Sequence, residues 1–155
     1  MHPTISQLWQ DYRMHNPQAP EALPIAYHFC DNEVDAQLCL DLVLAGQKRA
    51  TASSLAELKL NADAIPQVGD FAIITDWQGR AVCVIRTHTV EFRSFAEVDA
   101  DFAYIEGEGD RSLTWWREAH FQYFSRVLAE TDILVDDNLE IVCEQFELVF
   151  GARQA

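Results

Sequence analysis

A lysine and a threonine three residues apart are the side chains in this sequence whose types and spacing best suit catalysis. Lys48 and Thr51 lie in the stretch GQKRATAS, which begins at Gly46. The stretch follows a predicted helix and leads into a predicted strand, so an ammonium group and a hydroxyl can project into one pocket. The other interpretation is a basic helix C-terminus followed by an ordinary strand. On spacing alone we favour this structural interpretation over a catalytic one, because GxKxxT is a weak pattern.

Carboxylates gather around two glycines later in the chain. The stretch EGEGDR contains Glu106, Glu108, Asp110 and Arg111. Glycine allows the backbone to approach a ligand closely, so the two glutamates are candidate functional residues. The alternative is a solvated loop in which Asp110 caps the following helix.

Aromatic side chains and a histidine recur at helical spacing between Trp115 and Ser125. Aromatic rings can stack on nucleic acid bases, but a stripe at this spacing is more often part of a core. We therefore interpret the stripe, including His120, as packing. Histidine, cysteine and acidic residues do not recur at the spacing of known metal motifs, so we predict neither a metal ion nor another cofactor.

The charge of the chain limits its partners. Its 155 residues include 11 lysines and arginines against 25 aspartates and glutamates, which gives a net charge of −14. A protein that grips a phosphate backbone usually offers a basic face, because affinity comes largely from neutralising phosphates. The excess of acidic residues disfavours tight polynucleotide binding, and we expect no DNA partner. A neutral nucleoside or a short single-stranded RNA remains compatible.

The sequence also indicates a compartment. No apolar run approaches the roughly 20 residues that span a bilayer, and no signal peptide is recognisable. None of the cysteines forms a CxxC pair, so they are interpreted as reduced and buried: Cys30, Cys39, Cys83 and Cys143. We expect a cytoplasmic protein that does not contact a membrane, and the sequence does not indicate its oligomeric state.

The order of predicted elements indicates an α+β fold. A first helix is predicted at about 4–14 with Thr4 as its N-cap, and a second follows Asp31 or Asn32 and ends near Gly46. Its buried face is predicted to hold Val34, Leu38, Leu42 and Val43. A short helix follows Ser94, and Asp110 is predicted to cap a helix at 111–129. The predicted strands are 26–29, 71–75, 81–92 and 139–150. Without regular βαβ alternation, these elements predict one domain over residues 1–155, a small β-barrel flanked by helices.

Several segments together resemble the ASCH family. The GQKRAT stretch resembles the GxKxxT signature of that family. Further segments in the same order resemble its longer bacterial branch: Pro66–Asp70, Val82–Thr87, Glu106–Leu113, Trp116–His120 and Val142–Glu147. The resemblance extends from about residue 9 to residue 150. It implies a PUA-like β-barrel with a cleft and a link to RNA or nucleosides.

The resemblance also implies roles for particular residues. A smaller relative is an amidohydrolase that removes acyl groups from N(4)-acylcytidines, and its lysine, threonine and glutamate correspond to Lys48, Thr51 and Glu106. A modified pyrimidine nucleoside is therefore the expected substrate. A longer relative is a ribonuclease for single strands, and other members are thought to read RNA without chemistry, so both alternatives stay open. Substrate contacts are expected from Arg49, Ser53, Glu108, Arg111 and Ser125.

Amide hydrolysis requires a nucleophile, a proton acceptor and a group that stabilises an oxyanion. Thr51 supplies a hydroxyl, and Lys48 can accept its proton only if the lysine is neutral. Arg49 would favour the neutral form of Lys48, whereas pairing with Glu106 would favour the charged form, so the proton acceptor stays open. Because Lys48 follows a helix end among polar residues, we expect it to contribute little to stability.

Overall fold

The computed structural model describes residues 1–151 of the chain. Helices and strands alternate irregularly along it, as an α+β fold requires. In chain order they are α1 Pro3–His15, β1 Ile25–Tyr27, α2 Glu33–Leu44, β2 Ala50–Ser54, α3 Leu55–Leu60, β3 Phe71–Thr75, β4 Ala81–Ser94, the 3-10 helix η1 Phe95–Glu97, α4 Ala100–Glu106, α5 Leu113–Val127 and β5 Glu140–Gly151.

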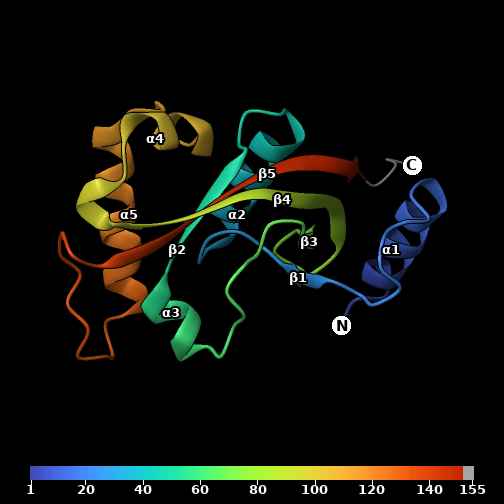
Figure 1. Ribbon diagram of the computed structural model, residues 1–155, viewed down its shortest axis with the longest axis horizontal. Helices are drawn as coiled ribbons and strands as arrows, with labels where there is room; N and C mark the ends of the chain where they lie inside the picture. The colour runs from blue at the N-terminus through green and yellow to red at the C-terminus, as the bar shows by residue number, and fades with distance from the viewer. Residues whose placement is uncertain (152–155) are drawn as a thin grey trace.

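The strands form one sheet in the order β1-β3-β4-β5-β2 (Figure 1). β1 runs parallel to β3, and every other neighbouring pair is antiparallel. The register between β4 and β5 shifts at Val84/Ile85 and again at Thr87/Thr89. Such bulges bend and twist a sheet, and this one curls into a half-barrel with β1 and β2 as its edges. The predicted α+β class and small barrel flanked by helices are confirmed.

Helices cover both faces of the sheet. α1 packs on Ile73 and Val84, whereas α2 packs on the alternate residues Ile74 and Ile85 of the same two strands. This alternation follows from the two-residue period of a strand. The aromatic residues of α4 and α5 form a third cluster with Ile141 and Cys143 of β5 and its neighbours. Figure 1 shows α4 and α5 at one end of the molecule and α1 at the other.

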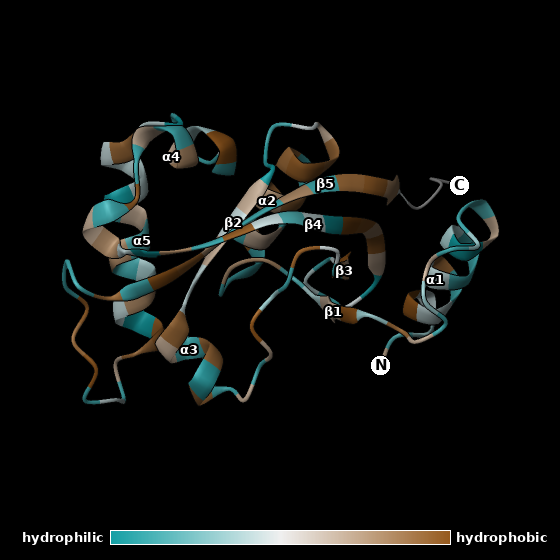
Figure 2. Ribbon diagram, in the orientation of Figure 1, coloured by the Kyte–Doolittle hydropathy of each residue, from teal (hydrophilic) through white to brown (hydrophobic). Residues whose placement is uncertain are grey.

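The helices are amphipathic, and Figure 2 shows hydrophobic and hydrophilic residues mixed around α1 and α5. The predicted face of α2 is correct only in part: Val43 is buried as expected, but two other members are not. Val34 is 77% exposed and Leu38 is 55% exposed. The residues that α2 buries include the small side chains Ala36 and Cys39, which allow the helix to approach the sheet closely. The prediction is therefore wrong for Val34 and Leu38, and the buried face consists of Ala36, Cys39, Leu40 and Val43.

Two predicted N-caps are also wrong, because a residue two positions away accepts the capping hydrogen bond instead. The N-cap of α1 is His2, and the Thr4 hydroxyl instead accepts a hydrogen bond from the Ala81 amide at 2.9 Å. The N-cap of α5 is Ser112, whose own amide donates to the Asp110 carboxylate at 2.8 Å. Asn32 caps α2 as predicted. Among residues 1–151, no helix is long and apolar enough to cross a membrane.

Candidate active site

A close backbone contact joins the GQKRATAS stretch, which contains Lys48, to the EGEGDR stretch, which contains Glu106. Gly107 ends α4 with a φ of +78°, and a Cβ at this position would lie 2.5 Å from the Gln47 carbonyl oxygen. Only glycine fits this approach without displacement. The Gln47 side-chain amide donates to the Gly107 carbonyl at 2.7 Å, and the Arg49 amide donates to the Ile105 carbonyl at 3.0 Å. Lys48 is therefore held directly against the α4 C-terminus.

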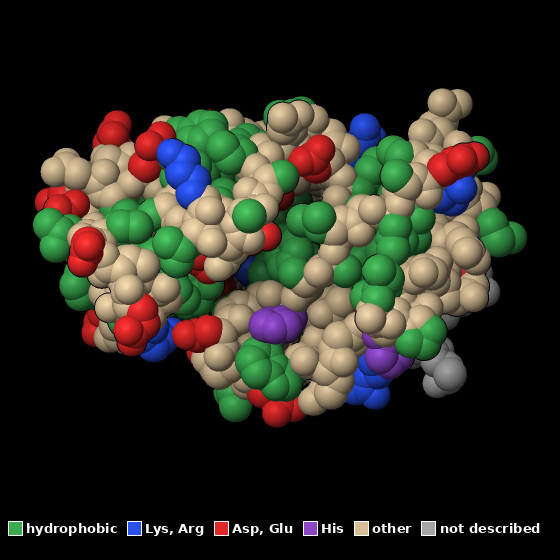
Figure 3. Space-filling model, turned by 90° about the horizontal axis from the view of Figure 1, so that it is seen from below, with side chains coloured by type: hydrophobic (Ala, Val, Ile, Leu, Met, Phe, Trp, Pro, Cys, Tyr) green, Lys and Arg blue, Asp and Glu red, His purple; other side chains and the backbone are tan. Residues whose placement is uncertain are grey.

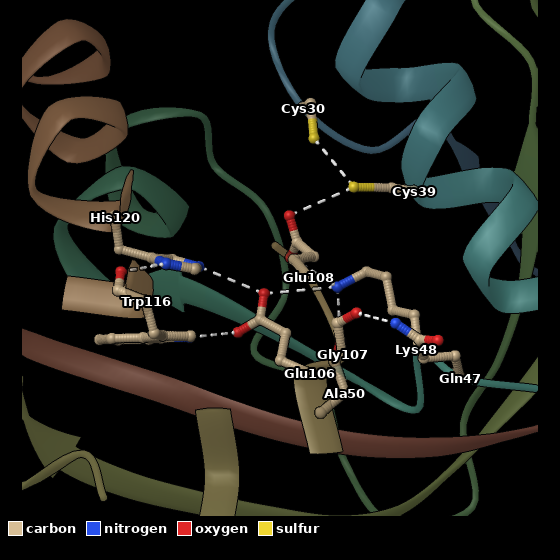
Figure 4. A network of polar contacts seen from close by, with 10 residues as sticks. All are labelled: Cys30, Cys39, Gln47, Lys48, Ala50, Glu106, Gly107, Glu108, Trp116 and His120. Carbon is tan, nitrogen blue, oxygen red and sulfur yellow. Dashed lines mark hydrogen bonds and ion pairs between the residues drawn. The ribbon is translucent and has the colours of Figure 1, made fainter. Parts of the chain in front are cut away.

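Lys48 is buried, with its side chain only 1% exposed. Its ammonium donates to the Ala50 carbonyl at 2.7 Å, to Glu108 Oε2 at 3.0 Å and to Glu106 Oε2 at 3.3 Å (Figure 4). Three acceptors around one nitrogen use all three N–H bonds of a protonated lysine. Burial opposes the charge, but Glu108 and Glu106 raise the pKa of Lys48 above its usual value. The ammonium is therefore charged and is not a proton acceptor.

Glu106 is the most tightly held member of the cluster. The Trp116 indole N–H donates to Glu106 Oε1 at 2.7 Å, and Lys48 and His120 both contact Oε2. Burial by itself would raise the pKa of Glu106, but the charges of Lys48 and His120 hold that pKa well below its usual range. This carboxylate stays ionised and positions its two cationic neighbours.

His120 is the second cation of the cluster. Its Nδ1 lies 2.8 Å from the Trp116 carbonyl oxygen, and its Nε2 lies 3.2 Å from Glu106 Oε2. Both neighbours are acceptors, so both ring nitrogens must carry a proton, which is the imidazolium form. Burial disfavours that charge, but Glu106 raises the pKa of His120 above 6.5.

Glu108 is the carboxylate that faces outward, with its side chain 17% exposed against 3% for Glu106. One oxygen accepts from Lys48, and Oε1 accepts from the Cys39 thiol at 3.3 Å. Burial raises the pKa of Glu108; the Lys48 charge lowers it, and the Glu106 charge adds to the increase. Glu108 is therefore the better proton acceptor of the two glutamates.

The cluster forms the floor of a cleft of about 1120 Å³. Both edge strands of the sheet line it, together with α2, α3, α5 and the 106–109 segment. Figure 3 shows this face hollowed near its centre, with hydrophobic side chains inside and carboxylates at the rim. Among the described residues that line the cleft, the carboxylates are Asp31, Asp35, Glu57, Asp63, Asp70, Glu106, Glu108 and Glu144, and the lysines and arginines are Lys48 and Arg126. The cleft favours neutral or donor-rich ligands over polyanions.

Comparison with known proteins identifies the family. A family model for the ASCH domain matches residues 25–150. The chain belongs to the ASCH family. It is 33% identical to an ASCH domain from Lactobacillus crispatus JV V101, over 97% of this chain and 96% of that one, with a TM-score of 0.88. It is 29% identical to a protein from Enterococcus faecalis V583, over 97% and 91% of the two chains, with a TM-score of 0.86. A comparison with curated proteins found no significant match.

The ASCH domain brings some of the predicted site residues together and leaves others apart. Lys48, Glu106 and Glu108 form the cluster, and Thr51 and Ser53 of β2 line the same cleft. The remaining three lie outside the cleft lining. Arg49 is exposed, the Arg111 guanidinium donates to the Tyr104 carbonyl and lies 3.5 Å from the Tyr104 ring centre, and Ser125 lies on α5.

Two expectations about the ASCH site change with this geometry. Lys48 is buried among charges, which removes the basis for expecting it to contribute little to stability. His120 does pack in the core, as its helical spacing indicates, but it also bonds Glu106. A signal for this role was the joint presence of a histidine and a tryptophan four residues apart on one helix face.

Within residues 1–151, two groups of side chains have the ligand atoms to hold a metal ion. In Glu106, Glu108 and His120, and in Cys30, Cys39 and Glu108, the ligand atoms lie within 4.8 Å of one another. The carboxylates of the first group already accept hydrogen bonds from the Lys48 ammonium and from the Trp116 indole N–H. These donors compete with a metal for the same oxygens, so the first group fits an ion pair better than a metal.

The stability of the domain is expected to fall as the pH rises above the usual range of histidine. The raised pKa of His120 means that the folded state binds this proton more tightly than the unfolded state does. Its contribution is complete below pH 6.5 and is lost as the pH rises through the higher folded pKa. Urea unfolding of wild type and His120→Gln from about pH 5.5 to about pH 9 measures this effect.

The difference between the two unfolding profiles isolates His120 from Lys48, Glu106 and Glu108, which titrate in both proteins. His88→Gln, at an exposed position on β4, is the matched control and should follow wild type. Parallel profiles for wild type and His120→Gln would contradict the imidazolium assignment.

Proposed function

We propose that this ASCH domain is an amidohydrolase that removes acyl groups from N(4)-acylated cytidine or cytosine. The observation that carries the proposal is the buried Lys48–Glu106–Glu108 cluster at the floor of the cleft. It pairs a fixed positive charge with a carboxylate that can exchange a proton, and amide hydrolysis needs both. The cytidine substrate follows from the resemblance to the smaller amidohydrolase of the family.

The character of the cleft supports a nucleoside rather than a polynucleotide. Its volume of about 1120 Å³ lies slightly above the roughly 300–1,000 Å³ of small-molecule sites, and its acidic lining repels a phosphate backbone. Tyr27, Trp115 and Tyr123 contribute aromatic surface to the lining, and rings of this kind stack on bases. A neutral acylated nucleoside matches these features better than RNA does.

In the proposed reaction, the Thr51 hydroxyl attacks the acyl carbon and passes its proton to Glu108. Protonated Glu108 no longer holds Lys48 as an ion pair, so one ammonium N–H turns to the oxyanion that forms on the acyl oxygen. Glu106 stays ionised and keeps Lys48 in place. Proton transfer and oxyanion stabilisation are thereby coupled through a single hydrogen bond.

Collapse of the tetrahedral intermediate breaks the C–N bond. Glu108 returns its proton to the departing N4 nitrogen, which leaves as the amine of cytidine. Water then hydrolyses the Thr51 ester, with Glu108 accepting a proton from the water and returning it to the Thr51 oxygen. The sum is acylcytidine and water going to cytidine and a carboxylic acid, so Thr51 and Glu108 end as they began.

The proposal is tested with N(4)-acetylcytidine and single-stranded RNA in separate incubations, each followed by chromatography. We expect release of cytidine and acetate, and intact RNA. Because no step passes through a metal, activity should persist after exhaustive chelation. Cleaved RNA beside untouched nucleoside would favour the ribonuclease alternative, and RNA protected without turnover of either substrate would favour a binding module.

A further inference from the structure

Two thiols lie side by side at the wall of the cleft. Cys30 Sγ and Cys39 Sγ are 3.4 Å apart, and Cys39 Sγ lies 3.3 Å from Glu108 Oε1 (Figure 4). The three residues come from the segment before α2, from α2 itself and from the segment after α4. Cys30 adopts a φ of +65°, a conformation that non-glycine residues rarely take. The fold therefore holds this arrangement in spite of a local backbone cost.

The distance between the two sulfur atoms distinguishes a disulfide from a pair of metal ligands. A disulfide requires sulfur atoms about 2.05 Å apart. Two thiolates on one tetrahedral zinc ion, with Zn–S bonds of about 2.3 Å, lie roughly 3.7 Å apart. The observed 3.4 Å is much nearer to the second value. A carboxylate oxygen on the same ion would lie about 3.6 Å from each sulfur, and Glu108 Oε1 is 3.3 Å from Cys39.

We propose that Cys30, Cys39 and Glu108 form a binding site for a soft divalent cation of the zinc class, with its fourth coordination position open to the cleft. All three residues line the cleft, so an ion can enter from solvent. Two thiolates and one carboxylate around a divalent cation match the ligand preference of zinc, and three protein ligands leave one position for water.

Lys48 supports this site rather than competing with it. The ammonium contacts Glu108 Oε2, whereas Oε1 faces the thiols. A metal bound through Oε1 leaves the Lys48 ion pair intact, and the ion pair fixes the orientation of the ligand carboxylate. Zn²⁺ with two thiolates and one carboxylate carries a net charge of −1, which the adjacent Lys48 ammonium neutralises.

The site is tested by titrating reduced full-length protein with Co²⁺, which reports thiolate ligation through its charge-transfer and ligand-field absorption. We expect one Co²⁺ per chain with thiolate-to-cobalt bands, and displacement of Co²⁺ by Zn²⁺ with loss of the bands. Cys30→Ala and Cys39→Ala should each lower the affinity by more than about tenfold, since loss of an outer-shell partner alone costs 10- to 100-fold. Glu108→Gln should lower the affinity while leaving thiolate bands.

Cys143→Ala is the matched control, because this thiol is buried in the separate cluster against α4 and α5. It should bind Co²⁺ as wild type does, and circular dichroism verifies the fold of every variant. Absence of thiolate bands in the reduced wild type would overturn the proposal, as would unchanged affinity in folded Cys30→Ala and Cys39→Ala proteins. The readout is binding, so the outcome does not depend on the proposed hydrolysis.

Discussion

Replacing Lys48 with methionine is expected to remove most hydrolytic activity and to destabilise the fold at the same time. Methionine has a similar length but no charge, so Glu106 and Glu108 lose their shared cation in a buried site. Breaking a buried ion pair by removing one partner costs about 3–5 kcal/mol. Loss of an oxyanion-stabilising donor lowers kcat by about 10²- to 10³-fold. Urea unfolding and acetylcytidine turnover measure the two effects.

A double variant separates charge from packing at this position. In Lys48→Met/Glu108→Gln, one of the two carboxylates that lose their Lys48 partner is replaced by a neutral amide, so part of the lost stability should return. Activity should not return, because neither the cation nor the proton acceptor is restored. Lys59→Met, at an exposed position on α3, is the control and should change stability by less than about 0.5 kcal/mol. A stable Lys48→Met protein would show that the buried charges are not coupled as described.

The fold was largely accessible from local sequence signals. The residue types in 71–75 and 81–92 predicted two successive strands, and the structure pairs them as β3 and β4. The buried face of α2 was accessible only in part. Val43 is buried as predicted, but Val34 and Leu38 are exposed because the side of the helix that faces the sheet carries Ala36, Cys39 and Leu40 instead.

The sequence predicts the candidate site only in part, because the site residues come together through tertiary contacts. The motif resemblance selected Lys48 and Glu106, which lie 58 positions apart and are joined by an ion pair. It gave no indication that Lys48 is fully buried, since a GxKxxT pattern says nothing about what covers the ammonium. Likewise, the sequence indicates only a reduced, buried thiol at Cys39. Its contact with Glu108 depends on the tight approach at Gly107, which no local pattern encodes.

Replacing Thr51 with valine is expected to abolish turnover with little effect on the fold. Valine keeps the shape of threonine and suits the strand β2, so stability should change little. If Thr51 is the nucleophile, loss of its hydroxyl should lower kcat/KM on N(4)-acetylcytidine by on the order of 10³-fold or more. Thr51→Ser retains a hydroxyl and should retain measurable activity.

Ser53 provides the matched control for this series, because it lines the same cleft from the same strand. Ser53→Ala should lower activity only mildly, as expected for a binding or structural hydroxyl. Rapid acid quench and mass spectrometry should detect an acetyl group on the peptide that contains Thr51 in wild type, and none in Thr51→Val. Full activity in Thr51→Val would show instead that water attacks the acyl carbon directly. Glu108 would then take the proton of that water, and Lys48 would keep its role at the oxyanion.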